Sequence, residues 1–407
     1  MYITALDLGT SQIKVSVAEI QKDGKLSLLS VFKMPSVGLR KGEIISLEEA
    51  VKSLHRVINE IKQINKAAAK NIFINVGGGN IKIQNSRGIV AVSRADNEIY
   101  SDDIDRAISA SQAINLGPNR MILHSITREF VVDGIGEISD PLGMTGSRLE
   151  VNSLIIDAFK PTVNNLIKAV ELAGGKIGGL IYSPLAVGRS VLTKAQKELG
   201  AVVIDIGFGA TSMASYEEGK LIQAAVFPVG ASNITNDLAI GLKCPIKIAE
   251  TIKLSFGSAM AREVSSKEKI DLHQIDESLK SIINKHFIAE IIEVRLAEIF
   301  EFVNNELKFI GKLGKLPAGA MIAGAGAKMP HIIELAKQEL KLSAQLGIPE
   351  LSDIEFTNSE FEAQLGDSEF SVCVGLLLWG ADQSLKENGW SMTKKGLFSK
   401  ILKHFLP

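Results

Sequence analysis

One pattern occurs twice in this chain, about half a chain length apart, and it limits the fold more than any other feature. Residues 3–20 read as a strand that ends at Asp7, a glycine turn and a second strand. Residues 201–217 repeat this order, with Asp205 in the place of Asp7. In both copies an acidic residue followed by glycine then leads into a third strand, which is a hairpin signal. The repeat predicts two related α/β domains that face each other.

The segments between the repeats predict further elements. Apolar residues at helical spacing predict a helix from Leu47 to Ile64. Between about Gln84 and Glu150 the sequence pattern changes. It predicts short strands around a helix that starts at Ser101, which indicates a small inserted α+β domain. We expect a long helical stretch over 247–312, a strand over 321–326 and a helix over 330–340.

Composition excludes several classes of protein. The formal net charge of -1 gives no global sign of nucleic-acid binding. Two distant cysteines, Cys244 and Cys373, argue against a disulfide framework and fit a reducing cytosol, and the six histidines lack metal-ligand spacing. The N-terminus shows no secretory leader, and no apolar stretch reaches the roughly 20 residues that span a bilayer. We therefore expect any membrane contact to be peripheral.

The two hairpins carry chemistry that suits a nucleotide. A strand that delivers an aspartate into a glycine turn presents backbone N–H groups to an anion. Mg²⁺ prefers oxygen ligands and keeps several waters, so Asp7 and Asp205 are candidate metal ligands. Residues 322–330 add a third element, a strand that enters a small-residue loop before a proline. We expect ATP and Mg²⁺ to bind between the two domains.

Each of these elements alone is more often an ordinary turn than a binding site. A single Asp-x-Gly turn is usually only a hairpin, and a single Gly-Ala-Gly-Ala loop says little more. The three elements in this order, together with the repeat, favour nucleotide binding because independent signals agree.

At this point the chain resembles the actin superfamily, which includes actin, MreB, chaperone ATPases and sugar kinases. The Asp7 segment resembles its first phosphate motif, residues 205–211 the second and residues 324–327 the adenosine motif. Further segments resemble the bacterial cell-division FtsA family: 123–134 and 140–150 in its inserted subdomain, and 228–237, 249–253 and 293–300 in its second half. The resemblance implies a duplicated, ribonuclease H-like α/β fold of the actin type with an FtsA-type insert.

The resemblance also implies site residues. The implied nucleotide contacts are Asp7, Gly9, Thr10, Ser11, Gln12, Lys14, Asp205, Gly207, Gly209, Ala210, Thr211, Gly324, Ala325, Gly326 and Lys328, with ribose contacts at Glu250 and Lys253. Arg295 and Glu298 lie in the region that receives the FtsZ tail in such proteins. The chain departs from the family at Gln12, where FtsA proteins commonly carry lysine; Lys14 lies two residues on.

The family resemblance divides the chain into subdomains. We expect subdomain IA at 1–83, 157–198 and 365–388, the inserted subdomain IC at 84–156, IIA at 199–246 and 310–364, IIB at 247–309, and a linker with a terminal helix at 389–407. The implied function is an ATP-binding protein, at most a slow ATPase, that polymerises through contacts of its insert and tethers FtsZ to the cytoplasmic membrane at the septum. The alternatives are a PilM-like pilus-assembly protein and a small-molecule kinase.

The last residues have a sharp amphipathic pattern. On a helix, one face would carry Leu397, Phe398, Ile401, Leu402, Phe405 and Leu406, and the other Lys400 and Lys403. A polar stretch, Asp382 to Asn388, precedes them and reads as a linker. Lysines beside an apolar face fit a helix that binds an anionic membrane surface, and docking on the protein's own core is the alternative.

Overall fold

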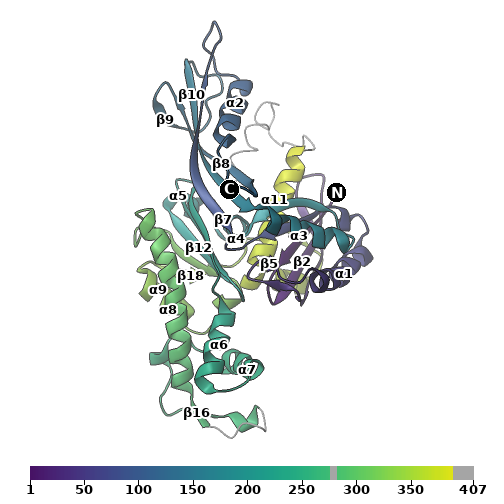
Figure 1. The fold of residues 1–407 in the computed structure, drawn as a ribbon, viewed down its shortest axis with the longest axis vertical. Helices are drawn as coiled ribbons and strands as arrows, with labels where there is room; N and C mark the ends of the chain where they lie inside the picture. Colours follow the sequence, from purple (N-terminus) through teal and green to yellow (C-terminus); the bar gives the residue numbers. More distant parts are fainter. Residues whose placement is uncertain (276–281, 388–407) are drawn as a thin grey trace.

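The two copies of the repeat form the centres of two sheets with the same strand order (Figure 1). The computed structural model describes residues 1–275 and 282–387. The first sheet runs β11-β6-β1-β2-β3, with β19 (Ile354–Phe356) added beside β3, and the second runs β18-β17-β12-β13-β14. The five strands that the sheets share make the two halves copies in topology as well as in sequence. The first sheet comprises β1 (Tyr2–Leu8), β2 (Gln12–Ile20), β3 (Leu26–Pro35), β6 (Ile72–Val76) and β11 (Ile177–Tyr182), and the second β12 (Ala201–Ile206), β13 (Thr211–Glu217), β14 (Lys220–Phe227), β17 (Gly319–Ala323) and β18 (Ala344–Leu346).

Helices cover both faces of each sheet, which explains why the central strands are apolar throughout rather than alternating. The outer face of the first sheet packs on α1 and α3, and that of the second on α8 and α9. Between the sheets, α11 lies on the first sheet and α4 on the second, and the two helices pack against each other. These helices are α1 (Leu47–Ile64), α3 (Lys160–Leu172), α4 (Ser183–Val191), α8 (Lys285–Phe309), α9 (Ile332–Leu340) and α11 (Ser371–Glu387).

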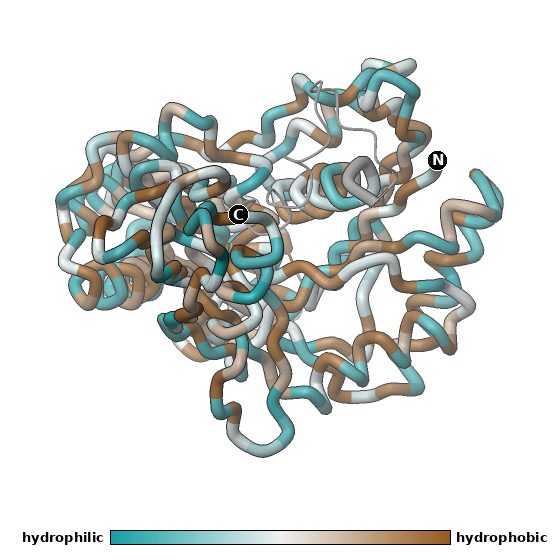
Figure 2. Tube along the Cα trace, turned by 90° about the horizontal axis from the view of Figure 1, so that it is seen from above, coloured by the Kyte–Doolittle hydropathy of each residue, from teal (hydrophilic) through white to brown (hydrophobic). Residues whose placement is uncertain are grey.

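Helix α1 has the bounds that its periodicity predicts. Its first turn is capped by Ser46, whose side chain accepts a hydrogen bond from the Glu49 backbone N–H. Leu54, Val57 and Ile61 are among its buried residues, while charged residues occupy the outer side. Figure 2 shows the same alternation of hydrophobic and hydrophilic residues along the outer helices.

The expected insert is a separate lobe with its own core (Figure 1). Its sheet runs β7-β10-β8-β9, and α2 packs on one face. The two short strands predicted over 121–132 are one strand, because a shift in pairing between Asn152 and Ser153 of β10 keeps β8 paired along its length. The elements are β7 (Ile81–Ala91), α2 (Ser101–Gln112), β8 (Arg120–Val132), β9 (Ile135–Ile138) and β10 (Arg148–Phe159).

The structure corrects two predictions of helices in the second half. The stretch 247–312 is not one helix: α7 ends before Gly257, and α8 begins only after a segment with a small hairpin. The helix expected from Pro330 starts at Ile332, because a short 3₁₀ helix occupies residues 325–328 and His331 adopts a left-handed conformation before it. The elements concerned are α6 (Ala231–Leu242), α7 (Ile246–Phe256), β15 (Lys269–Asp271) and β16 (Ile282–Asn284).

The chain also returns to the first half earlier than the expected boundary at residue 365. β19 (Ile354–Phe356) pairs in parallel with β3, and the Leu26 backbone N–H donates to the Asp353 carbonyl at 3.1 Å. The polar stretch from Asp382 is not a linker over its described part, since α11 continues to Glu387 and Asp382 pairs with Arg189 at 3.0 Å. The remaining short elements are β4 (Leu39–Arg40), β5 (Glu43–Ile44), α5 (Lys194–Leu199) and α10 (Ser359–Leu365).

Candidate nucleotide site

A cavity of about 260 Å³ lies between the two halves, where the turns after β1 and β12 face each other. Both predicted hairpin turns and the predicted loop after β17 line it. Of the expected nucleotide residues, those that line the cavity are Asp7, Gly9, Thr10, Ser11, Gln12, Lys14, Asp205, Gly207, Gly209, Ala210, Glu250, Gly324 and Ala325. The structure thus gathers residues that lie more than 300 positions apart in the sequence.

The first hairpin brings an acid and a base together in this cavity. β1 and β2 pair so that Asp7 stands directly opposite Lys14. The Lys14 Nζ lies 3.2 Å from Asp7 Oδ2, and both side chains are largely buried. Burial alone would lower the pKa of Lys14, but the neighbouring carboxylates of Asp7 and Asp205 outweigh it and raise that pKa above its ordinary value. Lys14 therefore stays charged.

The second hairpin places Asp205 at the equivalent point. Burial raises the pKa of Asp205 to about 7, with Lys14 lowering it and Asp7 adding to the rise. The residue opposite Asp205 is Ser212, whose hydroxyl is buried, lines the cavity and has no hydrogen-bond partner among the described residues. Two carboxylates and an orphaned hydroxyl in one cavity fit a Mg²⁺ ion that takes its other ligands from phosphate and water.

The two turns approach each other closely at a glycine. A Cβ added at Gly209 would lie 2.5 Å from the Thr10 Oγ1, so a side chain there would push the halves apart. Thr10 is itself held, because its Oγ1 accepts a hydrogen bond from the Lys41 backbone N–H. The start of α6 fixes the second turn, since the N–H groups of Ala231 and Ser232 donate to its carbonyls at 2.9 and 2.8 Å.

The loop after β17 is tied to the start of α11. Gly324 has a φ of 85°, which favours glycine, and its N–H donates to the Ser368 carbonyl. The Ser368 hydroxyl donates back to the Gly324 carbonyl at 3.2 Å. Lys328 pairs with Asp367 at 2.6 Å and does not line the cavity.

The other expected residues divide between the cavity wall and its support. Glu250 lines the cavity, whereas Lys253 is buried behind it and donates to Glu250 at 2.7 Å and to Thr235 at 2.9 Å. Lys253 thus orients Glu250 rather than facing the cavity. Thr211 and Gly326 are also absent from the cavity lining: the Thr211 hydroxyl donates to the Val229 carbonyl, and Gly326 packs against Ile206.

Sequence reasoning missed four polar residues in the cavity: Asn75, Ser183, Ser212 and Glu369. The repeat could have revealed Ser212, because it follows Asp205 at the same spacing as Lys14 follows Asp7. Asn75 holds the first turn by accepting from the Leu8 N–H at 2.7 Å. The glycines at 77–79, just after Asn75, indicated a site there less strongly than the repeat indicated Ser212.

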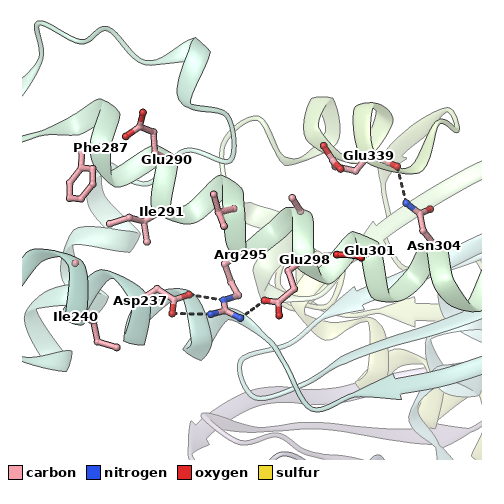
Figure 3. Close-up of a pocket in the computed structure, with 13 residues that line it drawn as sticks. Asp237, Ile240, Phe287, Glu290, Ile291, Arg295, Glu298, Glu301, Asn304 and Glu339 are labelled. Atoms are coloured by element: carbon pink, nitrogen blue, oxygen red, sulfur yellow. Dashed lines mark hydrogen bonds and ion pairs between the residues drawn. The ribbon is translucent and has the colours of Figure 1, made fainter.

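A second, larger pocket of about 1010 Å³ lies between α6 and α8 (Figure 3). Arg295, one of the two expected partner residues, lies in it and is held by both carboxylate oxygens of Asp237, at 2.6 and 3.0 Å. Glu298, the other, also contacts the Arg295 guanidinium. Phe287 and Ile291 give the pocket an apolar end. We call it the α6–α8 groove.

Within residues 1–275 and 282–387, no helix is long and apolar enough to cross a membrane. The same residues hold no cluster of three or more His, Cys, Asp or Glu side chains that could bind a metal without other ligands. The membrane residues expected at 397–406, and the linker before them, lie outside the described residues.

Two family models match the chain. Residues 202–375 match the model of the cell division protein FtsA, and residues 78–157 match that of the SHS2 domain inserted in FtsA. The second match coincides with the lobe formed by β7, α2, β8, β9 and β10.

Three curated relatives that match over most of the chain are cell division proteins FtsA. The protein of Pseudomonas aeruginosa is 32% identical over 97% of this chain and 92% of its own. That of Bacillus subtilis is 36% identical over 86% of this chain and 79% of its own, and that of Borreliella burgdorferi 31% identical over 98% and 97%.

Solved structures confirm the actin-like fold. A PilM–PilN type IV pilus biogenesis complex contains a chain similar to this one with a TM-score of 0.66, at 17% identity, over 93% of this chain and 98% of that chain. MreB5 of Spiroplasma citri bound to ADP gives a TM-score of 0.54 at 13% identity, over 95% and 98%.

Replacing Asp205 with alanine should weaken ATP binding in magnesium buffer at least about tenfold, because one of the two aspartates expected to hold Mg²⁺ is lost. Since a proton on Asp205 competes with the metal, wild-type affinity should rise by at most about tenfold per pH unit up to about pH 7 and level off above it. Calorimetry measures both effects. Asp23→Ala, in the exposed turn between β2 and β3 and outside the cavity, is the control. An unchanged affinity in Asp205→Ala would refute the assignment.

Proposed function

Because the chain belongs to the FtsA family of cell-division proteins, we propose that it binds ATP and Mg²⁺ between its halves, polymerises, and links FtsZ filaments to the cytoplasmic membrane at the division septum. The observation that carries the proposal is the cavity between the duplicated hairpins, in a chain whose relatives act in division. The alternatives of a PilM-like protein and a small-molecule kinase lose their basis, since the relatives that share about a third of its residues are FtsA proteins.

The nucleotide part rests on the two facing turns. MreB5 of Spiroplasma citri, which shares the fold, has been solved bound to ADP and to AMPPNP. In this chain the small residues of both turns border the cavity, and Asp7 and Asp205 would hold the metal. Bound between the halves, a nucleotide would tie them together and favour the closed form. Hydrolysis, at most slow, would then serve assembly rather than metabolism.

The FtsZ part rests on the α6–α8 groove. Carboxylates outnumber basic groups on its walls, and Arg295 is neutralised by Asp237. Ile240 and Val294 leave 76% and 72% of their surface exposed, so apolar area is available for burial. An extended tail with apolar and basic side chains would complement this groove, and we assign the FtsZ C-terminal tail to it.

The membrane part rests on the amphipathic pattern of residues 397–406. One such helix would bind an anionic surface weakly, while a filament presents many copies and gains avidity. The central experiment is co-sedimentation of the protein with FtsZ and anionic vesicles, with and without ATP. The proposal requires FtsZ to pellet with vesicles only when the protein is present, and fails if FtsZ stays in the supernatant.

Replacing Arg295 with alanine should weaken binding of an FtsZ tail peptide about tenfold, because the Arg295–Asp237 ion pair joins α8 to α6 and its loss lets the walls of the groove separate. Fluorescence anisotropy with a labelled peptide measures this. Arg262→Ala removes an exposed arginine outside the groove and should bind as wild type. Equal affinities for both variants would place the tail elsewhere.

If the insert contacts a neighbouring subunit, Ile135→Glu should block filaments seen by electron microscopy without changing ATP affinity. Ile135 is 71% exposed on β9, and a charge there would oppose burial in an interface. Leu172→Glu, at an exposed site on α3, serves as the matched control. Normal polymerisation of Ile135→Glu would remove this part of the insert from the contact.

Truncation after Asn388, or Phe398→Glu, should release the protein from anionic vesicles and leave ATP binding intact. Each buried large apolar side chain contributes roughly 1.5–3 kcal/mol at most, and a charge in its place opposes insertion. Flotation in a density gradient measures the bound fraction. A truncated protein that still floats would show that the anchor lies elsewhere.

A further inference from the structure

The inserted lobe has an extra residue in β8, close to the second half of the protein. Thr127 pairs with Ser153 of β10. Glu129 pairs with Asn152, the residue before, so Arg128 is left without a partner on β10. Such a bulge breaks the alternation of a strand and can turn two successive side chains toward the same space. Thr127 and Arg128 indeed both line one cavity, of about 190 Å³.

The second half supplies the opposite wall of this cavity from the turn between β13 and β14. Glu218 and Gly219 of the turn line it, together with Lys220 at the start of β14. The turn is held in place because its N–H groups donate to carbonyls at the end of α5, at 3.0 and 3.2 Å. β14 has a bulge of its own close by, where Ile222 has no partner on β13. The cavity therefore lies between the inserted lobe and the second half.

The Thr127 hydroxyl is the first sign that this cavity binds a ligand. The residue is only 4% exposed, and its Oγ1 has no hydrogen-bond partner among the described residues. Buried hydroxyls without a partner are rare, because burial removes their hydrogen bonds to water and nothing replaces them. Since Thr127 lines the cavity, a molecule bound there can supply the partner.

The charges on the walls are the second sign, and they favour an anion. Arg128 donates to Asn85 Oδ1 at 3.4 Å, near the limit of a hydrogen bond, and Lys220 Nζ lies 4.0 Å from Glu218 Oε2. Two weakly paired cations thus face one carboxylate. A guanidinium binds two phosphate oxygens at once, and an ammonium and a hydroxyl add further donors. The volume equals that of about six waters at 30 Å³ each, which suits a small anion.

A larger cavity of about 410 Å³ shares Arg128 and Lys220 but has the opposite charge balance. Its charged lining residues are four acidic and three basic ones: Glu129, Glu137, Glu217, Glu218, Arg87, Arg128 and Lys220. An anion is therefore favoured in the smaller cavity, where the basic groups are in excess.

We propose that the small cavity lined by Thr127, Arg128 and Lys220 binds the phosphate group of a small molecule, either inorganic phosphate or a phosphomonoester. Thr127 and Arg128 belong to the inserted lobe and Lys220 to the second half, so the bound phosphate joins the two. The site shares no lining residue with the nucleotide cavity. The inference is therefore independent of nucleotide binding.

Thr127→Val tests the role of the hydroxyl, because valine has nearly the shape of threonine. In a phosphate-free buffer the variant should melt about 2 °C above wild type, since no unpaired hydroxyl is buried. Added phosphate should raise its Tm by less than half the rise in wild type, since a donor to the anion is lost. A hydroxyl that a water satisfies would give neither effect, and that result would contradict the proposal. Differential scanning calorimetry measures both temperatures.

Arg128→Gln and Lys220→Gln test the two cations at partly exposed positions, where folding should be preserved. Titration calorimetry with inorganic phosphate should show affinity reduced at least about tenfold in each variant. Arg56→Gln, at an exposed site on α1 outside both cavities, should bind phosphate as wild type. A second titration with glycerol 3-phosphate distinguishes the sources, because tighter binding than inorganic phosphate identifies a monoester as the ligand.

Phosphate that binds in the nucleotide cavity would not respond to these changes, because Arg128 and Lys220 do not line that cavity. Equal phosphate affinity in wild type, Arg128→Gln and Lys220→Gln would therefore overturn the proposal. It would also be wrong if wild type bound neither phosphate nor glycerol 3-phosphate.

Discussion

The closed arrangement of this protein depends on one close approach, that of the turns after β1 and β12. Gly209 meets Thr10 with no room for a Cβ between them, so the two halves can come together only because one residue lacks a side chain. The same approach collects Asp7, Asp205 and Lys14 in one cavity and makes their charges interdependent. The missing side chain at Gly209 therefore determines how close the three charged groups of the cavity lie to one another.

Behind the turns, α4 and α11 form the contact between the sheets. Each helix covers a different sheet, and their shared core includes residues from both halves. At the end of α11, Arg189 of α4 pairs with Asp382. Because this contact is continuous, close-packed apolar surface, a rotation of one half against the other would require α4 and α11 to repack.

Features with local causes could be predicted from the sequence. The bounds of α1 follow from its periodicity, and the repeat of Asp7 at Asp205 places both aspartates at one cavity. What could not be predicted depends on distant partners. The three residues of β19 form a strand only because β3, more than 300 residues earlier, offers its edge. Lys328 resembles a phosphate ligand until Asp367 is placed beside it. That the buried Ser212 hydroxyl lacks a hydrogen-bond partner among the described residues can be known only from the positions of all its neighbours.

The tie between Gly324 and Ser368 gives α11 a mechanical role. Ser368 holds the loop beside the cavity, and α11 begins at Ser371 and runs to Glu387. Its 17 residues make a rod of about 25 Å at 1.5 Å per residue. A helix is stiff along its axis, so a ligand that displaced the loop would tilt the far end of this rod. That far end is where the chain continues toward its last residues. The position of the C-terminal end of α11 would then depend on whether the cavity holds a ligand.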